Sequence, residues 1–214
     1  GQIGLVVFIM LLALLVSSGL SYLNHSISIP ADWKRIFDKM ELDYNRQVEA
    51  IVGLNDLSAF LVSIVVMAFL PALCEETLFR GGLQNFLARS TRNSWFAIIV
   101  VSLIFSAVHF SYYGFIPRLF LGMVLGLIYH YSGRLWLSII AHFTNNVLAL
   151  SMLYYYKSQG KPLQEAVDQS NESVWGLFAL PLVIGLFIYF KRISSKRESE
   201  NYESPGSKFQ IPNS

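Results

Sequence analysis

The chain has 214 residues, of which 54% are hydrophobic and 14% are charged, and its mean hydropathy is +0.47. About a quarter of the residues of a water-soluble domain are charged, so this composition excludes an ordinary soluble globular protein. The formal net charge of +2 is too small to indicate a nucleic-acid partner, and the single cysteine, Cys74, excludes an intrachain disulfide and a cluster of metal-binding thiols.

Apolar runs divide the chain into membrane spans. Several of them approach or exceed the about 20 residues that cross the hydrocarbon core of a bilayer. We therefore predict an all-α fold, a polytopic transmembrane helical bundle of about six spans: residues 3–23, 57–90, 93–112, 116–131, 135–156 and 174–190. In this prediction residues 1–190 form one membrane domain, and the basic residues 191–214 form a disordered cytoplasmic tail.

The connections between spans carry two further signals. Residues 24–56 are polar, but five apolar side chains fall close to one helical face: Trp33, Ile36, Phe37, Met40 and Leu42. This pattern predicts an amphipathic helix at the membrane interface, with a solvated helical loop as the alternative. Basic residues follow the second, fourth and sixth spans, and the positive-inside bias places these three segments on the cytoplasmic side.

The second span contains charged residues at membrane depth: Glu75, Glu76 and Arg80. An ionised side chain at the bilayer centre costs about 2.5–3.5 kcal/mol on insertion scales, so such groups persist where they face protein or trapped water and serve a function. We expect a kink at Pro71, one turn before the glutamates. The more polar final third of the span, residues 80–90, is expected to project from the membrane or lie at its surface.

Two other spans carry polar groups that can reach the glutamates. With a turn near residue 91, Glu75 and His109 are nearly equidistant from it, so an antiparallel helical hairpin brings them to the same depth. His109 follows Phe105 by one helical turn. His142 and Asn146, also one turn apart, lie on one face of the fifth span. These groups predict a hydrated polar cavity inside the membrane.

The remaining polar residues of the spans have simpler interpretations. We interpret Asn145 as a hydrogen-bonding partner between helices and His130 as a residue of the membrane interface. Arg118, at the start of a span, is interpreted as an anchor whose charge snorkels to the interface. Gly122 and Gly126 have the spacing of a face for close helix packing.

The residue types in the predicted cavity are suited to hydrolysing an amide bond. A glutamate beside a histidine can hold and deprotonate a water. A second histidine and an asparagine amide can donate hydrogen bonds to the oxyanion that forms when this water attacks a carbonyl. The chain has no Ser-His or Cys-His nucleophile pattern, no HExxH motif and no pair of intramembrane aspartates, which disfavours the mechanisms that use them.

In this order and spacing, Glu75-Glu76-x-x-x-Arg80, Phe105-x-x-x-His109 and His142-x-x-x-Asn146 resemble the three motifs of the CPBP family of intramembrane proteases (CAAX protease and bacteriocin-processing, also called Abi). The resemblance covers residues 72–146. It implies that Glu75 activates the water with help from His109, that His142 and Asn146 stabilise the oxyanion, and that Glu76 and Arg80 support the site. It also implies an intramembrane endopeptidase acting on a prenylated CAAX-type protein or a bacteriocin or leader peptide. Family members often have more spans, which indicates a truncated or shorter member.

Several alternatives remain open at this stage. Glu75, His109 and His142 could bind Zn²⁺, although a metal-free glutamate mechanism uses the same residues and is favoured. A non-catalytic membrane scaffold or a proton-coupled transporter could use the same cavity. The expected partners are membrane lipid and a membrane-associated peptide or protein substrate, and no feature identifies a membrane-protein partner. We expect a multi-pass protein of a bacterial plasma membrane, with its site facing the cytoplasm.

Overall fold

The computed structural model describes residues 1–51, 56–161 and 173–203, which are mainly helical and contain no strand. Five helices in this part of the chain are long and apolar enough to cross a membrane: Gln2–His25, Leu57–Thr91, Phe115–Ser132, Leu135–Ser158 and Val174–Ser195. A shorter apolar helix, Ser94–Ala107, takes the place of the third expected span. The prediction of an integral membrane protein with an all-α, polytopic helical fold is confirmed.

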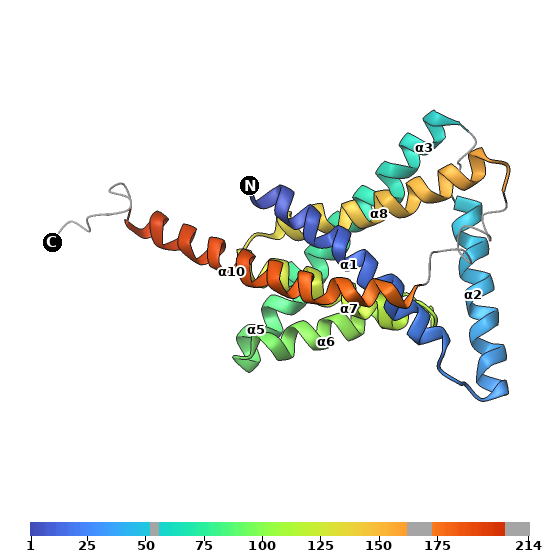
Figure 1. The fold of residues 1–214 in the computed structure, drawn as a ribbon, viewed down its shortest axis with the longest axis horizontal. Coiled ribbons are helices and arrows are strands. Elements are labelled where there is room, and N and C mark those ends of the chain that lie inside the picture. The colour runs from blue at the N-terminus through green and yellow to red at the C-terminus, as the bar shows by residue number, and fades with distance from the viewer. Residues whose placement is uncertain (52–55, 162–172, 204–214) are drawn as a thin grey trace.

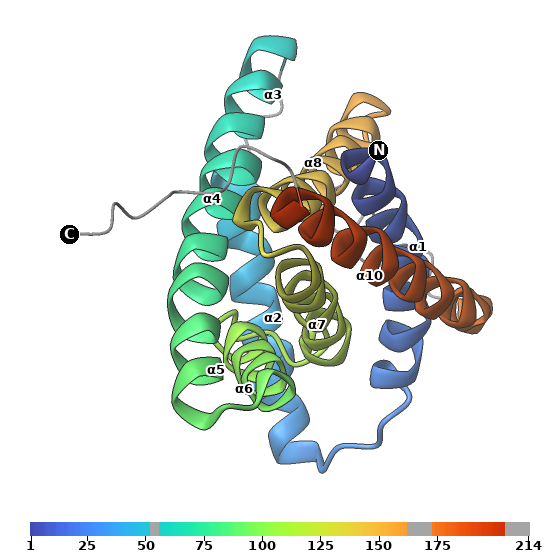
Figure 2. The same ribbon diagram turned by 90° about the vertical axis from the view of Figure 1, so that its left-hand side faces the viewer.

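The first helix contacts four other elements of the bundle. α1 (Gln2–His25) packs against α7 (Phe115–Ser132), α8 (Leu135–Ser158), η3 (Val174–Ala179) and α10 (Leu180–Glu203). Figures 1 and 2 show α1 between α10, α7 and α8. The buried apolar core of the bundle is formed by side chains from these helices, among them Ile9, Leu125, Leu137 and Phe190. Because many other large apolar side chains of the bundle are exposed on its outside, the surface suits lipid.

The second span is one continuous stretch of helix with two π-helical turns. It consists of α3 (Leu57–Ser63), η1 (Ile64–Phe69), α4 (Leu70–Glu76), η2 (Thr77–Gln84) and α5 (Asn85–Thr91). Pro71 lies in the first turn of α4, directly after η1, where its missing N–H is accommodated by the change of helical register. The two π-helical segments, η1 and η2, flank Glu75 and Glu76. Because π-helical turns occur frequently at functional sites, their position is consistent with a functional role of the two glutamates.

A hairpin connects α5 to α6 (Ser94–Ala107). Arg92 adopts the left-handed conformation with φ 53°, and Asn93 Oδ1 accepts a hydrogen bond from Phe96 N at 3.0 Å to begin α6. α6 ends at Ala107, so the expectation of a span reaching Tyr112 is wrong. The chain turns there, as the φ of 51° at Phe110 shows.

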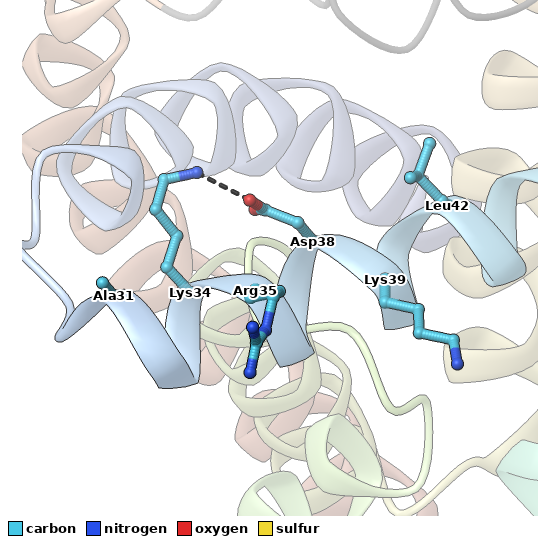
Figure 3. A pocket seen from close by; sticks show the side chains of 6 residues that line it. All are labelled: Ala31, Lys34, Arg35, Asp38, Lys39 and Leu42. Atoms are coloured by element: carbon cyan, nitrogen blue, oxygen red, sulfur yellow. Dashed lines mark hydrogen bonds and ion pairs between the residues drawn. The ribbon is translucent and has the colours of Figure 1, made fainter.

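The polar connection 24–56 contains α2 (Ala31–Ile51), which lies across the end of the bundle opposite the N-terminus (Figure 1). The predicted amphipathic helix is therefore present. Its inner side contacts the segment after α6: the rings of Phe37 and Tyr112 stack with centroids 4.4 Å apart, and Ser111 Oγ donates to Glu41 Oε2 at 2.9 Å. A shallow hollow of about 420 Å³ on its charged side is lined by this helix alone and contains the Lys34–Asp38 ion pair (Figure 3).

The last helix is longer than expected. α10 continues to Glu203, so residues 191–203 are helical where a disordered tail was predicted. No Gly or Pro occurs between residues 191 and 203, and the charged residues there have good helix propensity. The rest of the predicted tail, residues 204–214, lies outside the described residues. The α5–α6 turn, the start of α8 and the end of α10 lie at the same end of Figure 1, and the side of the membrane they face stays a prediction.

Candidate active site

The second span contains a buried ion pair that contacts His142 of α8. Arg80 Nη1 lies 2.7 Å from Glu76 Oε1, and both side chains are fully buried. The same carboxylate oxygen lies 2.9 Å from His142 Nδ1. Glu76 and Arg80 share one helix face because they are four residues apart, and this face turns toward α8. Arg80 is thus neutralised by Glu76, and Glu76 also fixes one nitrogen of His142.

Two glycine carbonyls on α7 bind the polar part of the second span. Arg80 Nη2 donates to Gly122 O and Gln84 Nε2 donates to Gly126 O, each at 3.0 Å. A Cβ added at Gly126 would lie 3.0 Å from Gln84 Oε1, so the close packing predicted for these glycines is confirmed. Arg80 and Gln84 are buried because α7 offers them backbone acceptors, and the expectation that the segment from Arg80 onward projects from the membrane or lies at its surface stays a prediction.

Glu75 faces two imidazole rings. Its Oε2 is buried without a hydrogen-bond partner in the protein and lies 4.0 Å from His109 Nε2 and 3.9 Å from His142 Nε2. The helical hairpin predicted from the sequence therefore brings Glu75 close to His109, as expected. Both gaps are too long for a direct hydrogen bond and have the width that one bridging water fills.

The orientation of His109 fixes its tautomer. Its Nδ1 lies 2.7 Å from Phe105 O, and its ring centroid lies 4.9 Å from that of Phe105. Because a carbonyl oxygen only accepts hydrogen bonds, Nδ1 carries a proton, and in the neutral ring the lone pair of Nε2 points toward Glu75. The Phe105 ring also lies 5.8 Å from His142 and 4.7 Å from Arg80 Cζ, so it supports the whole cluster.

Asn146 lies one turn beyond His142 on α8. Its Nδ2 donates to Ala68 O in η1 over a long 3.4 Å, and its Oδ1 accepts from Asn145 Nδ2 at 3.0 Å. Asn145, predicted to serve contacts between helices, instead lines the same cavity as Asn146 and orients its amide. Sequence spacing did not reveal this role, because neighbouring helical residues point about 100° apart and only their long amides bring them together.

The cluster opens into a cavity of about 330 Å³. Polar groups from three parts of the chain line it together: His109, Arg118, His142 and the two asparagines. Its remaining lining is mainly apolar, from α1, α6, α7 and α8, and includes Tyr44 of α2. Arg118 therefore faces the cavity, where an anchor snorkelling to the interface was predicted. A polar cavity inside the bundle is what the sequence predicted.

The zinc alternative requires Glu75, His109 and His142 to converge on one ion. Ligand atoms of a four-coordinate zinc lie about 3.3 Å apart, because each bond is about 2.0–2.1 Å long. The two imidazole nitrogens lie 3.9 and 4.0 Å from the Glu75 oxygen, and no group of three His, Cys, Asp or Glu side chains within the described ranges is placed to hold a metal. As placed, these residues do not fit zinc, and the expected independence from metal stays a prediction.

Comparison with known proteins finds a family that is similar to the segment containing this cluster. Residues 57–148 match the family model described as Type II CAAX prenyl endopeptidase Rce1-like. The chain is 38% identical over 84 residues to the uncharacterized protein YpbD of Bacillus subtilis (strain 168), a match that covers 37% of this chain and 40% of that protein. No solved structure matches. The matched segment contains all three motifs and the residues around Glu75. The predicted resemblance is thus confirmed for this segment: residues 57–148, less than half of the chain, are similar to the Rce1-like family.

Proposed function

We propose that this protein is an intramembrane endopeptidase that hydrolyses a peptide bond of a membrane-associated substrate with a water activated by Glu75 and His109. The observation that carries the proposal is the convergence of two imidazole Nε2 atoms on one buried carboxylate oxygen. A scaffold needs no such convergence. The description of the matched family, a prenyl endopeptidase, supports the same activity.

The tautomer of His109 defines how the water is held. A water between His109 Nε2 and Glu75 Oε2 donates one hydrogen bond to each, because both atoms accept. Its free lone pair then points away from both, toward the space in which a substrate carbonyl would lie. As the water attacks the carbonyl carbon, its proton passes to Glu75, which acts as general base. The same proton then goes to the leaving amine when the C–N bond breaks.

The oxyanion is stabilised from the side of α8. Asn146 Nδ2 has a second N–H besides the one directed at Ala68 O, and this N–H is free to donate. The Nδ1 atom of His142 donates to Glu76, whose carboxylate also accepts from Arg80. The Nε2 atom therefore donates to the oxyanion only when the ring carries both protons. We assign the doubly protonated ring of His142 as the oxyanion donor, held in place by Glu76.

The test uses the full chain reconstituted in vesicles with a panel of peptides: farnesylated CAAX sequences, unprenylated controls and bacteriocin leader peptides. We expect cleavage of at least one class, and its loss in Glu75→Gln and His109→Ala. Removing a general base costs about 10²–10⁴-fold in rate. Glu75→Gln keeps the shape of the side chain, so its far-ultraviolet circular dichroism and thermal unfolding should match those of the unmodified protein.

Two outcomes separate this proposal from its alternatives. Cleavage that survives a chelator supports the metal-free mechanism, whereas cleavage abolished by the chelator and restored by Zn²⁺ refutes it. If no peptide is cut and both variants support the same cellular phenotype as the unmodified protein, the protein acts as a scaffold and the catalytic proposal is wrong.

A further inference from the structure

His109 lies beyond the end of a helix, on the turn that leads from α6 toward α7. α6 ends at Ala107, and the backbone N–H of His109 reaches Ser106 O over a long 3.4 Å. The next residue, Phe110, has a φ of 51°, in the left-handed region that residues other than glycine and asparagine rarely adopt. A backbone conformation of this kind persists only where the surrounding structure holds it, and it occurs most often at functional sites.

Contacts of the residues that follow Phe110 hold this conformation. The ring of Phe110 itself is 71% exposed and therefore adds little packing. Ser111 Oγ donates to Glu41 Oε2 at 2.9 Å, and Tyr113 Oη donates to Asp38 Oδ1 at 2.5 Å. Both acceptors belong to α2, which precedes this segment by 70 or more residues in the sequence. The turn after α6 is thus bound by a distant helix.

The same segment is also bound through its aromatic rings and its backbone. The rings of Phe37 and Tyr112 stack with centroids 4.4 Å apart. Asn24, at the end of α1, donates from Nδ2 to the carbonyls of Tyr112 and Tyr113 at 3.0 and 3.1 Å. The side chains of Asn24 and Ser111 are buried, so water does not compete freely for these hydrogen bonds. Residues 111–113 are therefore fixed by α2 and by the end of α1.

We infer that Glu41 and Asp38 of α2 are positioning residues for the imidazole of His109. By holding the turn, they keep His109 Nε2 at the distance from Glu75 that one water bridges. A displacement of about 1 Å in a catalytic site can lower the rate by about 100-fold, so a small shift of the turn is enough to matter. The inference rests on the proposed function and adds a role for α2, which lies outside the segment that matches the family.

The first test removes the hydrogen bonds between the turn and α2. On a peptide that the unmodified protein cleaves, Glu41→Ala should lower kcat by about tenfold or more and change KM by less than about twofold. Asp38→Ala, which removes the acceptor of Tyr113, should act in the same way. Glu41→Gln should keep kcat within about twofold, because the amide oxygen still accepts from the Ser111 hydroxyl. Asp43→Ala removes an exposed carboxylate of the same helix and is the matched control, which should keep the full rate.

The second test changes the conformational preference of the turn. Asparagine is enriched severalfold in the left-handed region, so adding Phe110→Asn to Glu41→Ala should raise kcat by about threefold or more. Phe110→Ala removes the same exposed ring without this preference and should restore nothing. If Glu41 only stabilised α2, the loss of rate in Glu41→Ala would not respond to the preference of residue 110.

Chemical modification of His109 provides a readout that needs no cleavage. Diethyl pyrocarbonate modifies neutral imidazoles, and mass spectrometry of the digested protein reports each histidine separately. The His109 side chain is 25% exposed, so loosening the turn in Glu41→Ala should raise its rate of modification by about threefold or more. His130, at the opposite end of α7, should keep its rate. Ser111→Ala removes the other member of the hydrogen bond and covers the case in which Glu41→Ala does not fold.

Three results would overturn the inference. One is an unchanged kcat together with an unchanged modification rate of His109 in Glu41→Ala. Another is an equal loss of rate in Glu41→Gln, which would assign the effect to the charge of residue 41. The third is an equal effect of Phe110→Asn and Phe110→Ala in the Glu41→Ala background.

The modification rates also keep this inference separate from the protease proposal. If no peptide is cut but Glu41→Ala exposes His109 to the reagent as expected, the protease proposal fails and the positioning of His109 by α2 stands. If peptides are cut, and the α2 variants change neither the rate of cleavage nor the reactivity of His109, the protease proposal stands and the positioning role is refuted.

Discussion

Replacing Arg80 by Met tests whether the buried ion pair with Glu76 stabilises the packing of the second span. The two groups are fully buried at 2.7 Å, and Arg80 also donates to Gly122 O at 3.0 Å. Removing one member of a buried pair leaves an uncompensated charge, at a cost of about 3–5 kcal/mol. We expect Arg80→Met to lower the free energy of unfolding by this amount, a large share of the about 5–15 kcal/mol that stabilises a typical protein.

A double-mutant cycle isolates the pair from the other contacts of each residue. Glu76→Leu also strands a charge and should cost about 3–5 kcal/mol, whereas the double variant has no buried charge left to compensate. We therefore expect the double variant to be more stable than the sum of the single effects by about 2–3 kcal/mol. It should nevertheless lose activity, because Glu76 no longer fixes Nδ1 of His142.

The assay is reversible unfolding by SDS in mixed micelles, followed by far-ultraviolet circular dichroism. Two results would refute the reasoning. One is a loss under about 1 kcal/mol for Arg80→Met, which is the range of an exposed ion pair. The other is strict additivity in the cycle, which would mean that the two charges do not stabilise each other.

Two further predictions concern the packing of α7 and of α2. Gly126→Ala puts a Cβ 3.0 Å from Gln84 Oε1 and should cost about 1–3 kcal/mol of stability in the SDS assay. Lys34 and then Tyr113 donate hydrogen bonds to Asp38 and hold its pKa below the usual range. The stabilisation of a carboxylate with a lowered pKa is present above its unfolded value of about 3.9 and is lost as the pH falls through the folded value. The protection factors of the α2 amides, which are exchange rates corrected for the intrinsic effect of pH, should therefore fall below about pH 4.

Each of these predictions has its own control. A Cβ added at Gly4 or Gly185 meets nothing within 4 Å, so alanine at these positions should change stability by less than about 0.5 kcal/mol. An equal loss of stability for alanine at Gly126 and at these two sites would show that the contact between helices does not cause the loss. In Asp38→Asn, the protection factors of the α2 amides should be the same at pH 6 and at pH 3. If this variant loses as much protection at low pH as the unmodified protein does, a group other than Asp38 causes the loss.

The proximity of Glu75 and His109 could be predicted from the sequence because this proximity depends on few variables. Two antiparallel helices have the same rise per residue, so equal distances from the turn give equal depth whatever the packing details. The observed 4.0 Å between Glu75 Oε2 and His109 Nε2 holds even though α6 ends at Ala107. Beyond the helix end, the hydrogen bond from Nδ1 to Phe105 O ties the imidazole to the last turns of α6.

The burial of Arg80 and Gln84 was harder to predict because their acceptors are backbone carbonyls. Local polarity suggested that this segment leaves the membrane. Every residue has a backbone carbonyl, so the sequence does not reveal which carbonyls accept hydrogen bonds from another helix. A signal was nevertheless present. Arg80 and Gln84 are four residues apart, as are Gly122 and Gly126, and two such matched pairs on packed helices indicate paired contacts.

Arg118 shows why the start of a span does not determine where a long side chain points. An arginine there snorkels to the interface when that end of the helix faces lipid or water. Here α2, about 70 residues upstream, lies over the end of the bundle and is tied to the segment before α7 through Glu41 and Ser111. Tyr44 of α2 lines the same cavity as Arg118, and Gly114 provides the space into which the guanidinium fits. The direction of Arg118 thus depends on a contact between segments distant in sequence, which no local pattern around residue 118 contains.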